Sequence, residues 1–196
     1  MKKIILFLLV IGLSNAYVNS QNIVSDTYNL MPWPKNISEN PAKFIINSDV
    51  TISIESTKSE RVRNAAINFL RRLSNRTGTF FKEGFPLKHK EGHIKIIFEE
   101  VSNLNIKTDE SYTLDIDNTS IQINAKTDVG AIRALETLLQ LTKNDETDYF
   151  FSGVNITDAP RFVWRGLMID VARHFQPIHV LKRNLDAMAS VKMNVF

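Results

Sequence analysis

The strongest constraint on the fold is a change in hydrophobic period after residue 54. Val50, Ile52 and Ile54 alternate with polar residues, as in a strand with one buried face. From Ser59 onward, apolar residues recur at helical spacing, arginines take the opposite face, and Gly78 follows the last turn. The chain is therefore predicted to pass from a half-buried strand into an amphipathic helix.

The same two patterns return further along. Alternating apolar residues predict strands at 94–98, 112–116 and 121–125, and the polar residues at 117–120 are typical of a hairpin turn. A second helix is predicted from about Asp128. This order of elements indicates an α+β domain, in which two helices cover one face of a sheet.

A different pattern begins near residue 160. Residues 166–171 are almost continuously apolar, as expected of a parallel strand covered on both faces. Pro177 then stands where a helix would begin, and that helix is expected to bury an apolar face that includes Leu185 and Met188. Residues 193–196 start a further strand. Because such an opening cannot cover its own strands, we expect a second domain that the chain leaves incomplete.

Residues 1–16 have the composition of a secretory signal peptide. Lys2 and Lys3 precede an apolar run from Ile4 to Leu13, and small residues lead to Ala16. A permanent membrane anchor needs about 20 apolar residues, so this run is too short to serve as one. A buried helix or strand is the less favoured interpretation. We expect export to the periplasm or the exterior, with no integral membrane segment after signal removal.

Charge and cysteine content exclude several classes of partner and site. The signal holds two of the 24 basic residues, which leaves 22 against 21 acidic residues and predicts no nucleic-acid partner. There is no cysteine for a disulfide or a thiol nucleophile. The glycosylation sequons are interpreted as chance in an asparagine-rich chain; they lie at Asn36, Asn75, Asn118 and Asn155.

Most familiar chemical motifs are missing from the sequence. It has no glycine-rich phosphate loop and no Gly-x-Ser-x-Gly elbow, and its histidine pairs lack the spacing of metal ligands, so we predict no metal and no cofactor. Acidic pairs such as Asp109 and Glu110 are interpreted as solvated loop residues. One cluster stands out because its charges border an apolar strand: Arg165, Asp170, Arg173 and His174. A structural ion-pair network and a binding site explain it equally well.

Residues 160–175 read PRFVWRGLMIDVARHF, with a matching continuation to Phe196. This segment closely resembles the one that opens the catalytic barrel of family 20 β-N-acetylhexosaminidases. Residues 111–141 are similar to the end of the accessory α+β domain of that family. The resemblance implies three regions: a signal peptide at 1–16, an accessory domain at 17–159, and at 160–196 the truncated start of a (β/α)8 TIM barrel.

The resemblance also implies an activity. Members of the family hydrolyse terminal non-reducing N-acetylglucosamine or N-acetylgalactosamine from glycans by a retaining, substrate-assisted route. An Asp orients the acetamido group, and the adjacent Glu is the general acid and then the general base. Both are expected beyond Phe196. The 196-residue chain alone is therefore predicted to be inactive.

Among the residues present, the family's sugar-gripping arginine falls on Arg165. Asp170, Arg173 and His174 also match the family, and we assign them to support of the barrel mouth. Barrel sites lie at the C-terminal ends of strands, which suits these three residues better than Arg165 if the strand covers 166–171. A strand that starts earlier, or a twisted approach to it, would place Arg165 at the site as well.

Two alternatives remain open. In the first, the α+β domain acts alone as a non-catalytic module that binds a glycan or a partner. In the second, which is weaker because the Trp-Arg-Gly to Arg-His-Phe segment argues against it, the protein is another retaining hydrolase with a similar accessory domain. An open reading frame beyond the Phe196 codon, encoding His-x-His and a later Asp-Glu pair, would favour the family enzyme.

We predict that the signal is removed after Ala16, which leaves Tyr17 as the mature amino terminus. The peptidase recognises small residues that follow the apolar run. Amino-terminal sequencing of exported protein checks this cleavage. A soluble cytoplasmic product that retains Met1 would contradict it.

Overall fold

The computed structural model describes residues 28–56, 58–87 and 91–196. The predicted signal peptide and its cleavage site after Ala16 lie outside the described residues. Of the helices in the described ranges, none has the length and apolar character needed to cross a membrane.

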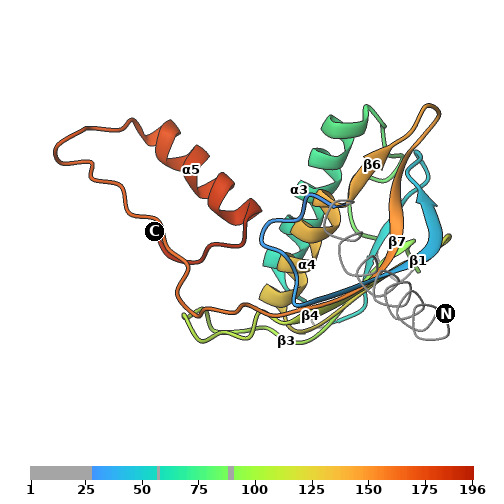
Figure 1. The fold of residues 1–196 in the computed structure, drawn as a ribbon, viewed down its shortest axis with the longest axis horizontal. Helices are drawn as coiled ribbons and strands as arrows, with labels where there is room; N and C mark the ends of the chain where they lie inside the picture. The colour runs from blue at the N-terminus through green and yellow to red at the C-terminus, as the bar shows by residue number, and fades with distance from the viewer. Residues whose placement is uncertain (1–27, 57, 88–90) are drawn as a thin grey trace, which may run out of the picture.

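A mixed sheet forms the body of the described structure (Figure 1). Its strands are β1 (Asn36–Ile45), β2 (Ile52–Ile54), β3 (Ile94–Glu100), β4 (Tyr112–Ile116), β5 (Ile121–Thr127), β6 (Thr142–Asn144) and β7 (Tyr149–Asp158). The order across the sheet is β1-β7-β4-β5-β3-β2, and β6 pairs with β7. β2, β3 and β5 are parallel to one another, whereas the other pairings are antiparallel. The predicted strands and the hairpin between β4 and β5 are confirmed.

The two predicted helices lie against one face of this sheet (Figure 1). α3 (Glu60–Thr77) starts at Ser59, whose side chain accepts a hydrogen bond from the Val62 amide, and it ends at Gly78, which has a left-handed φ of 72°. α4 (Asp128–Gln140) starts at Thr127, whose hydroxyl accepts from the Gly130 amide at 3.2 Å. Both helices therefore begin at a side-chain cap, and α3 also ends at a glycine cap.

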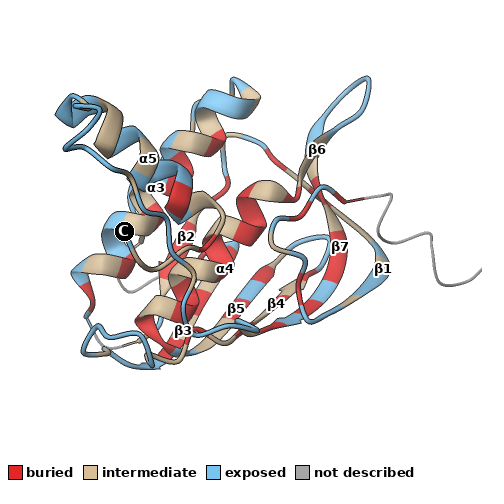
Figure 2. Ribbon diagram, turned by 60° about the vertical axis from the view of Figure 1, so that its left-hand side comes forward, coloured by how far each residue is buried: buried red, intermediate tan, exposed pale blue. Residues whose placement is uncertain are grey.

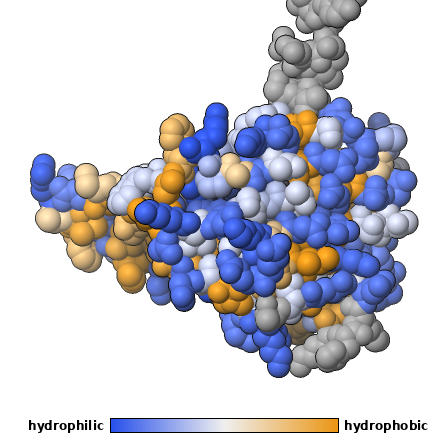
Figure 3. Space-filling model, turned by 90° about the horizontal axis from the view of Figure 1, so that it is seen from below, coloured by the Kyte–Doolittle hydropathy of each residue, from blue (hydrophilic) through white to orange (hydrophobic). Residues whose placement is uncertain are grey.

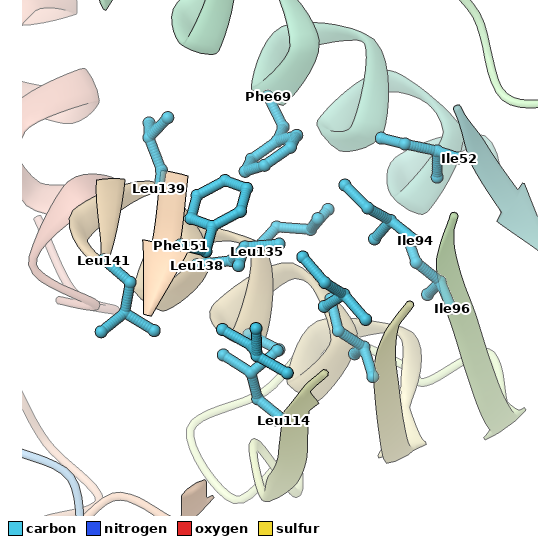
Figure 4. Packing of buried hydrophobic residues seen from close by; sticks show 14 of the residues in the cluster. Ile52, Phe69, Ile94, Ile96, Leu114, Leu135, Leu138, Leu139, Leu141 and Phe151 are labelled. Carbon is cyan, nitrogen blue, oxygen red and sulfur yellow. The ribbon is translucent and has the colours of Figure 1, made fainter. Parts of the chain in front are cut away.

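The core lies between the sheet and these helices (Figures 2 and 4). Alternate residues of β4 and β5 are fully buried, among them Leu114 and Ile123. Figure 4 shows Leu114 on the side of the sheet that faces Leu135 and Leu138 of α4. Burying one such side chain contributes about 1.5–3 kcal/mol. One-sided burial of the sheet is thus the main source of stability for residues 28–159.

The sequence pattern did not reveal β1, β6 or β7. β1 carries Pro41 and an irregular register between Glu39 and Lys43, so its side chains do not alternate regularly. Proline cannot donate to the ladder, and β1 tolerates it because this strand lies at the edge of the sheet. β6 is only 3 residues long, which is too short for a detectable period.

Residues 160–196 follow the sheet, and α5 (Ile178–Ser190) projects from it (Figure 1). The helix after Pro177 is confirmed. The covered strand at 166–171 is wrong for this structure, because within it only Gly166 forms a β-bridge, a parallel one with Val195, and Met168 is 90% exposed. The predicted buried face of α5 is also wrong except at Met188, since no second layer covers it among the described residues.

We predict that Gly130→Ala destabilises the protein. A Cβ on Gly130 would lie 2.4 Å from the Ser111 carbonyl oxygen, so helix and strand would have to separate. Such overpacking costs about 1–3 kcal/mol, more than the gain of about 1 kcal/mol in helix propensity. Urea denaturation of the mature chain measures the difference. Gly84→Ala is the control, because nothing lies within 4 Å of the added Cβ, and equal midpoints for the two variants would contradict the prediction.

Candidate functional site

Glu110 is the centre of a buried charge cluster between the sheet and residues 160–196. Its side chain is 7% exposed and accepts from Arg133 Nε at 2.6 Å. Arg165 Nη2 donates to both oxygens of the same carboxylate, at 2.6 and 2.7 Å. Arg133 belongs to α4 and Arg165 to the C-terminal segment. One carboxylate therefore joins the α+β domain to the segment that follows it.

A second buried ion pair lies beside the first. Lys192 Nζ donates to Asp158 Oδ2 at 2.9 Å and to the Tyr112 hydroxyl at 2.7 Å. That hydroxyl donates to Asp158 Oδ2 at 2.8 Å and lies 2.7 Å from Thr137 Oγ1. Asp158 ends β7 and Tyr112 begins β4, so two adjacent strands hold the lysine that follows α5.

The backbone of Lys192 connects the two ion pairs. Its carbonyl oxygen accepts from Arg165 Nε at 2.9 Å, while its own side chain reaches Asp158. Lys192 has a φ of 60°, in the left-handed region that costs a non-glycine residue roughly 1–2 kcal/mol. The surrounding hydrogen bonds are what hold it in this conformation.

Protonation in the cluster follows from burial and from the nearby charges. Burial acts to raise the pKa of Asp158, but the Lys192 cation and the hydrogen bonds to the carboxylate outweigh it and lower that pKa. Burial lowers the pKa of Lys192, although Asp158 opposes the shift. Burial and the Asp158 charge raise the pKa of Tyr112, so its hydroxyl stays protonated and available as a donor.

A cavity of about 100 Å³ opens beside the cluster. Trp33 and Phe162 give its wall aromatic surface, whereas Glu110 and Arg165 give it charge. Within the described ranges, no three acidic or histidine side chains are grouped so that they would hold a metal ion. Of the histidines considered as ligands, His89 lies outside the described residues and His93 contacts Thr51. The polar groups of the cavity can thus form hydrogen bonds and ion pairs.

Comparison with known proteins identifies the family. The profile "Glycosyl hydrolase family 20, domain 2" matches residues 27–159, and "Glycosyl hydrolase family 20, catalytic domain" matches residues 162–196. The chain belongs to glycosyl hydrolase family 20. The resemblance seen in the sequence is thereby confirmed.

Three relatives illustrate the match to this family. Beta-hexosaminidase subunit A1 of Dictyostelium discoideum is 32% identical over 98% of this chain and 35% of its own length. The chitobiase of Flavobacterium johnsoniae is 44% identical with a TM-score of 0.83, over 88% of this chain and 27% of that structure. The family 20 exo-β-N-acetylglucosaminidase of Vibrio harveyi is 29% identical with a TM-score of 0.65, over 86% and 25%. The chain thus spans about a third or less of these relatives.

The structure separates the four candidate site residues of this family 20 chain. Arg165 joins the buried cluster and is 16% exposed. Asp170 and Arg173 form a local ion pair at 2.9 Å, in which Arg173 is 88% exposed, and His174 is also exposed. No hydrogen bond or ion pair of the described residues connects these three to Arg165. The parallel pairing with residues 194–195 involves Arg165 as well as Gly166, so it begins one residue before the predicted strand at 166–171.

Sequence reasoning missed most of this cluster. Glu110 was interpreted as a solvated loop acid, which is wrong: it is nearly buried because two arginines distant in the sequence neutralise it. Arg133 was not singled out, because a charged residue on an amphipathic helix ordinarily faces solvent. Asp158 stood only as part of a boundary before Pro160. Their single shared signal is closeness to apolar strand ends, which many surface residues share.

We predict that Lys192→Met strongly destabilises the mature chain. The variant leaves Asp158 as a buried carboxylate without its cation, and breaking such a pair costs about 3–5 kcal/mol. Urea denaturation measures the loss. Lys82→Met is the control, since Lys82 and Asp49 form a pair that is 70% and 60% exposed, and its midpoint should hardly move.

The pH dependence of this loss has a defined sign. The folded pKa of Asp158 lies below its ordinary 3.8, so its stabilisation is present above that value and disappears as pH falls through the folded pKa. The difference between the wild type and Lys192→Met should therefore shrink as pH falls through the acidic range in which Asp158 takes up a proton. A difference that is constant from neutral to acidic pH would contradict the assignment.

Proposed function

We propose that the chain is part of an exported β-N-acetylhexosaminidase that removes terminal N-acetylglucosamine or N-acetylgalactosamine from glycans. The observation that carries the proposal is the catalytic-domain match at 162–196, directly after the domain 2 match. The related Vibrio harveyi enzyme was solved in complex with N-acetylglucosamine, which supports the substrate class. Export rests on the signal-like residues 1–16.

The proposed reaction retains the anomeric configuration and uses the substrate's acetamido group as nucleophile. The family's Asp, which orients that group, and its Glu, the general acid and base, are expected in the catalytic domain beyond Phe196. This chain would supply the opening of the barrel and one sugar-binding side chain. The chemistry requires no metal and no cofactor.

Arg165 is the proposed sugar-binding residue. Each of its three guanidinium nitrogens donates within the described structure, and Nη1 makes one contact, to the Phe162 carbonyl, so one N–H of Nη1 is left for a hydroxyl acceptor. A fixed planar donor suits the adjacent hydroxyls of a pyranose ring. Asp170, Arg173 and His174 keep the proposed role of supporting the barrel mouth.

Hydrolysis of chromogenic glycosides by the full-length gene product tests the proposed function. We expect release of nitrophenol from nitrophenyl N-acetyl-β-glucosaminide or N-acetyl-β-galactosaminide. The matched nitrophenyl β-glucoside should be a very poor substrate, because it lacks the acetamido nucleophile. No turnover of either amino sugar, or equal turnover of the glucoside, would overturn the proposal.

We predict that Arg165→Lys lowers kcat/KM of the full-length protein at least about 10-fold. Lysine keeps the charge but loses the planar fork, and a charged hydrogen bond contributes roughly 1.5–3 kcal/mol. Arg72→Lys is the control, because Arg72 pairs with Glu136 on the accessory domain. If Arg165 acts only in the ion pair, Tm falls while kcat/KM of the folded protein is unchanged.

A further inference from the structure

Three acceptors surround the guanidinium of Arg165, and one of them, Glu110, belongs to the accessory domain. Glu110, immediately before β4, binds Nη2 through both carboxylate oxygens. The Lys192 carbonyl binds Nε at 2.9 Å, and the Phe162 carbonyl binds Nη1 at 2.7 Å. Each of the three guanidinium nitrogens therefore has its own acceptor, and the plane of the group is fixed.

Glu110 is itself held in place. Arg133 Nε donates to its Oε2 at 2.6 Å, and Arg133 is anchored on α4, the helix that packs across the sheet. The Glu110 side chain is 7% and that of Arg133 12% exposed, so water has little access to compete for these bonds. Charge-assisted hydrogen bonds of this kind are short and strongly directional. The position of Glu110 is thus set by the folded accessory domain.

The Lys192 carbonyl, a second acceptor of Arg165, is also positioned by the accessory domain. Lys192 offers its carbonyl to Arg165 while its Nζ is bound by Asp158 and Tyr112. Asp158 additionally accepts from the Lys35 amide at 3.1 Å, which ties it to the chain before β1. Of the three acceptors of Arg165, Glu110 belongs to the α+β domain and Lys192 is held by it, whereas Phe162 belongs to the same segment as Arg165.

We propose that Glu110 is a positioning residue of the sugar subsite, which acts through Arg165. The inference rests on the proposed function, in which the remaining N–H of Arg165 binds a sugar hydroxyl. A displacement of about 1 Å in a substrate-positioning group can reduce the rate about 100-fold. The accessory domain is on this reasoning a structural component of the active site, and Glu110 is its contact with the substrate-binding arginine.

The test compares Glu110→Gln with a matched control in the full-length protein. Glutamine has the same shape but loses the charge and turns an amide NH₂ toward one of the two arginines, so kcat/KM should fall at least about 10-fold. The control is Asp128→Asn, which alters another buried acid of the same domain. Asp128 bonds Ser59 and Ser102 and pairs with Arg61. The Asp128→Asn variant should be less stable than the wild type, but kcat/KM of its folded protein should stay within about twofold of the wild-type value.

A double variant separates positioning from a general structural effect. If Glu110 acts through Arg165, then Glu110→Gln combined with Arg165→Lys should be no slower than the slower single variant. Multiplication of the two losses would overturn the proposal, as would a kinetic loss in Glu110→Gln no larger than in Asp128→Asn. If Glu110→Gln does not fold, Glu110→Asp replaces it, and normal kcat/KM in that variant overturns the proposal too. Absence of hydrolysis by the unaltered protein would instead remove the proposed function itself.

Discussion

Two buried carboxylates determine how the C-terminal segment meets the α+β domain. Glu110 and Asp158 lie at neighbouring strand ends, where an unpaired charge would be very costly. Arg165 and Lys192, which belong to the segment, lie 27 residues apart and bracket α5. Because each carboxylate requires its cation, residues 165–167 and 194–195 are brought side by side and form their parallel bridge. The pairing of charges thus fixes the register of this single bridge.

The elements that could be predicted from the sequence are those with regular one-sided burial. α3 has a capping serine, an apolar stripe and a terminal glycine, and the β4–β5 hairpin has alternation on both sides of a polar turn. β1 escaped prediction because Pro41 and a register shift interrupt its alternation. At residues 166–171 the error was the opposite one, because a strand was predicted and none is formed. Their apolar run suits a covered strand, but burial depends on neighbours that an isolated segment does not contain.

The residues of the candidate site also differ in whether the sequence could predict them. Arg165 was found through a motif, since its neighbours in the sequence carry the family resemblance, whereas the α+β-domain residues that support it come from the loop before β4, from α4 and from the end of β7. A pairing between positions 110 and 165 leaves no trace in local periodicity. The acid at position 110 has the composition of an ordinary loop residue, and its burial follows from two arginines that only the folded chain assembles. Sequence patterns therefore located the arginine and missed its supports.

Buried ion pairs contribute little net stability, because desolvation offsets much of the attraction. The cluster around Glu110 is better understood as a device that selects one geometry. Apolar contacts supply most stability elsewhere in the chain, yet Phe162, Trp164, Met168 and Phe175 are 64–90% exposed, and hydrophobic surface gathers over the projecting segment (Figure 3). In the proposed enzyme, the barrel would cover these side chains and provide the energy, while the charges set the orientation. With the proposed role of Arg165, such a division would account for a buried, costly network at the junction, because a hydrophobic contact tolerates sliding and a substrate-binding side chain does not.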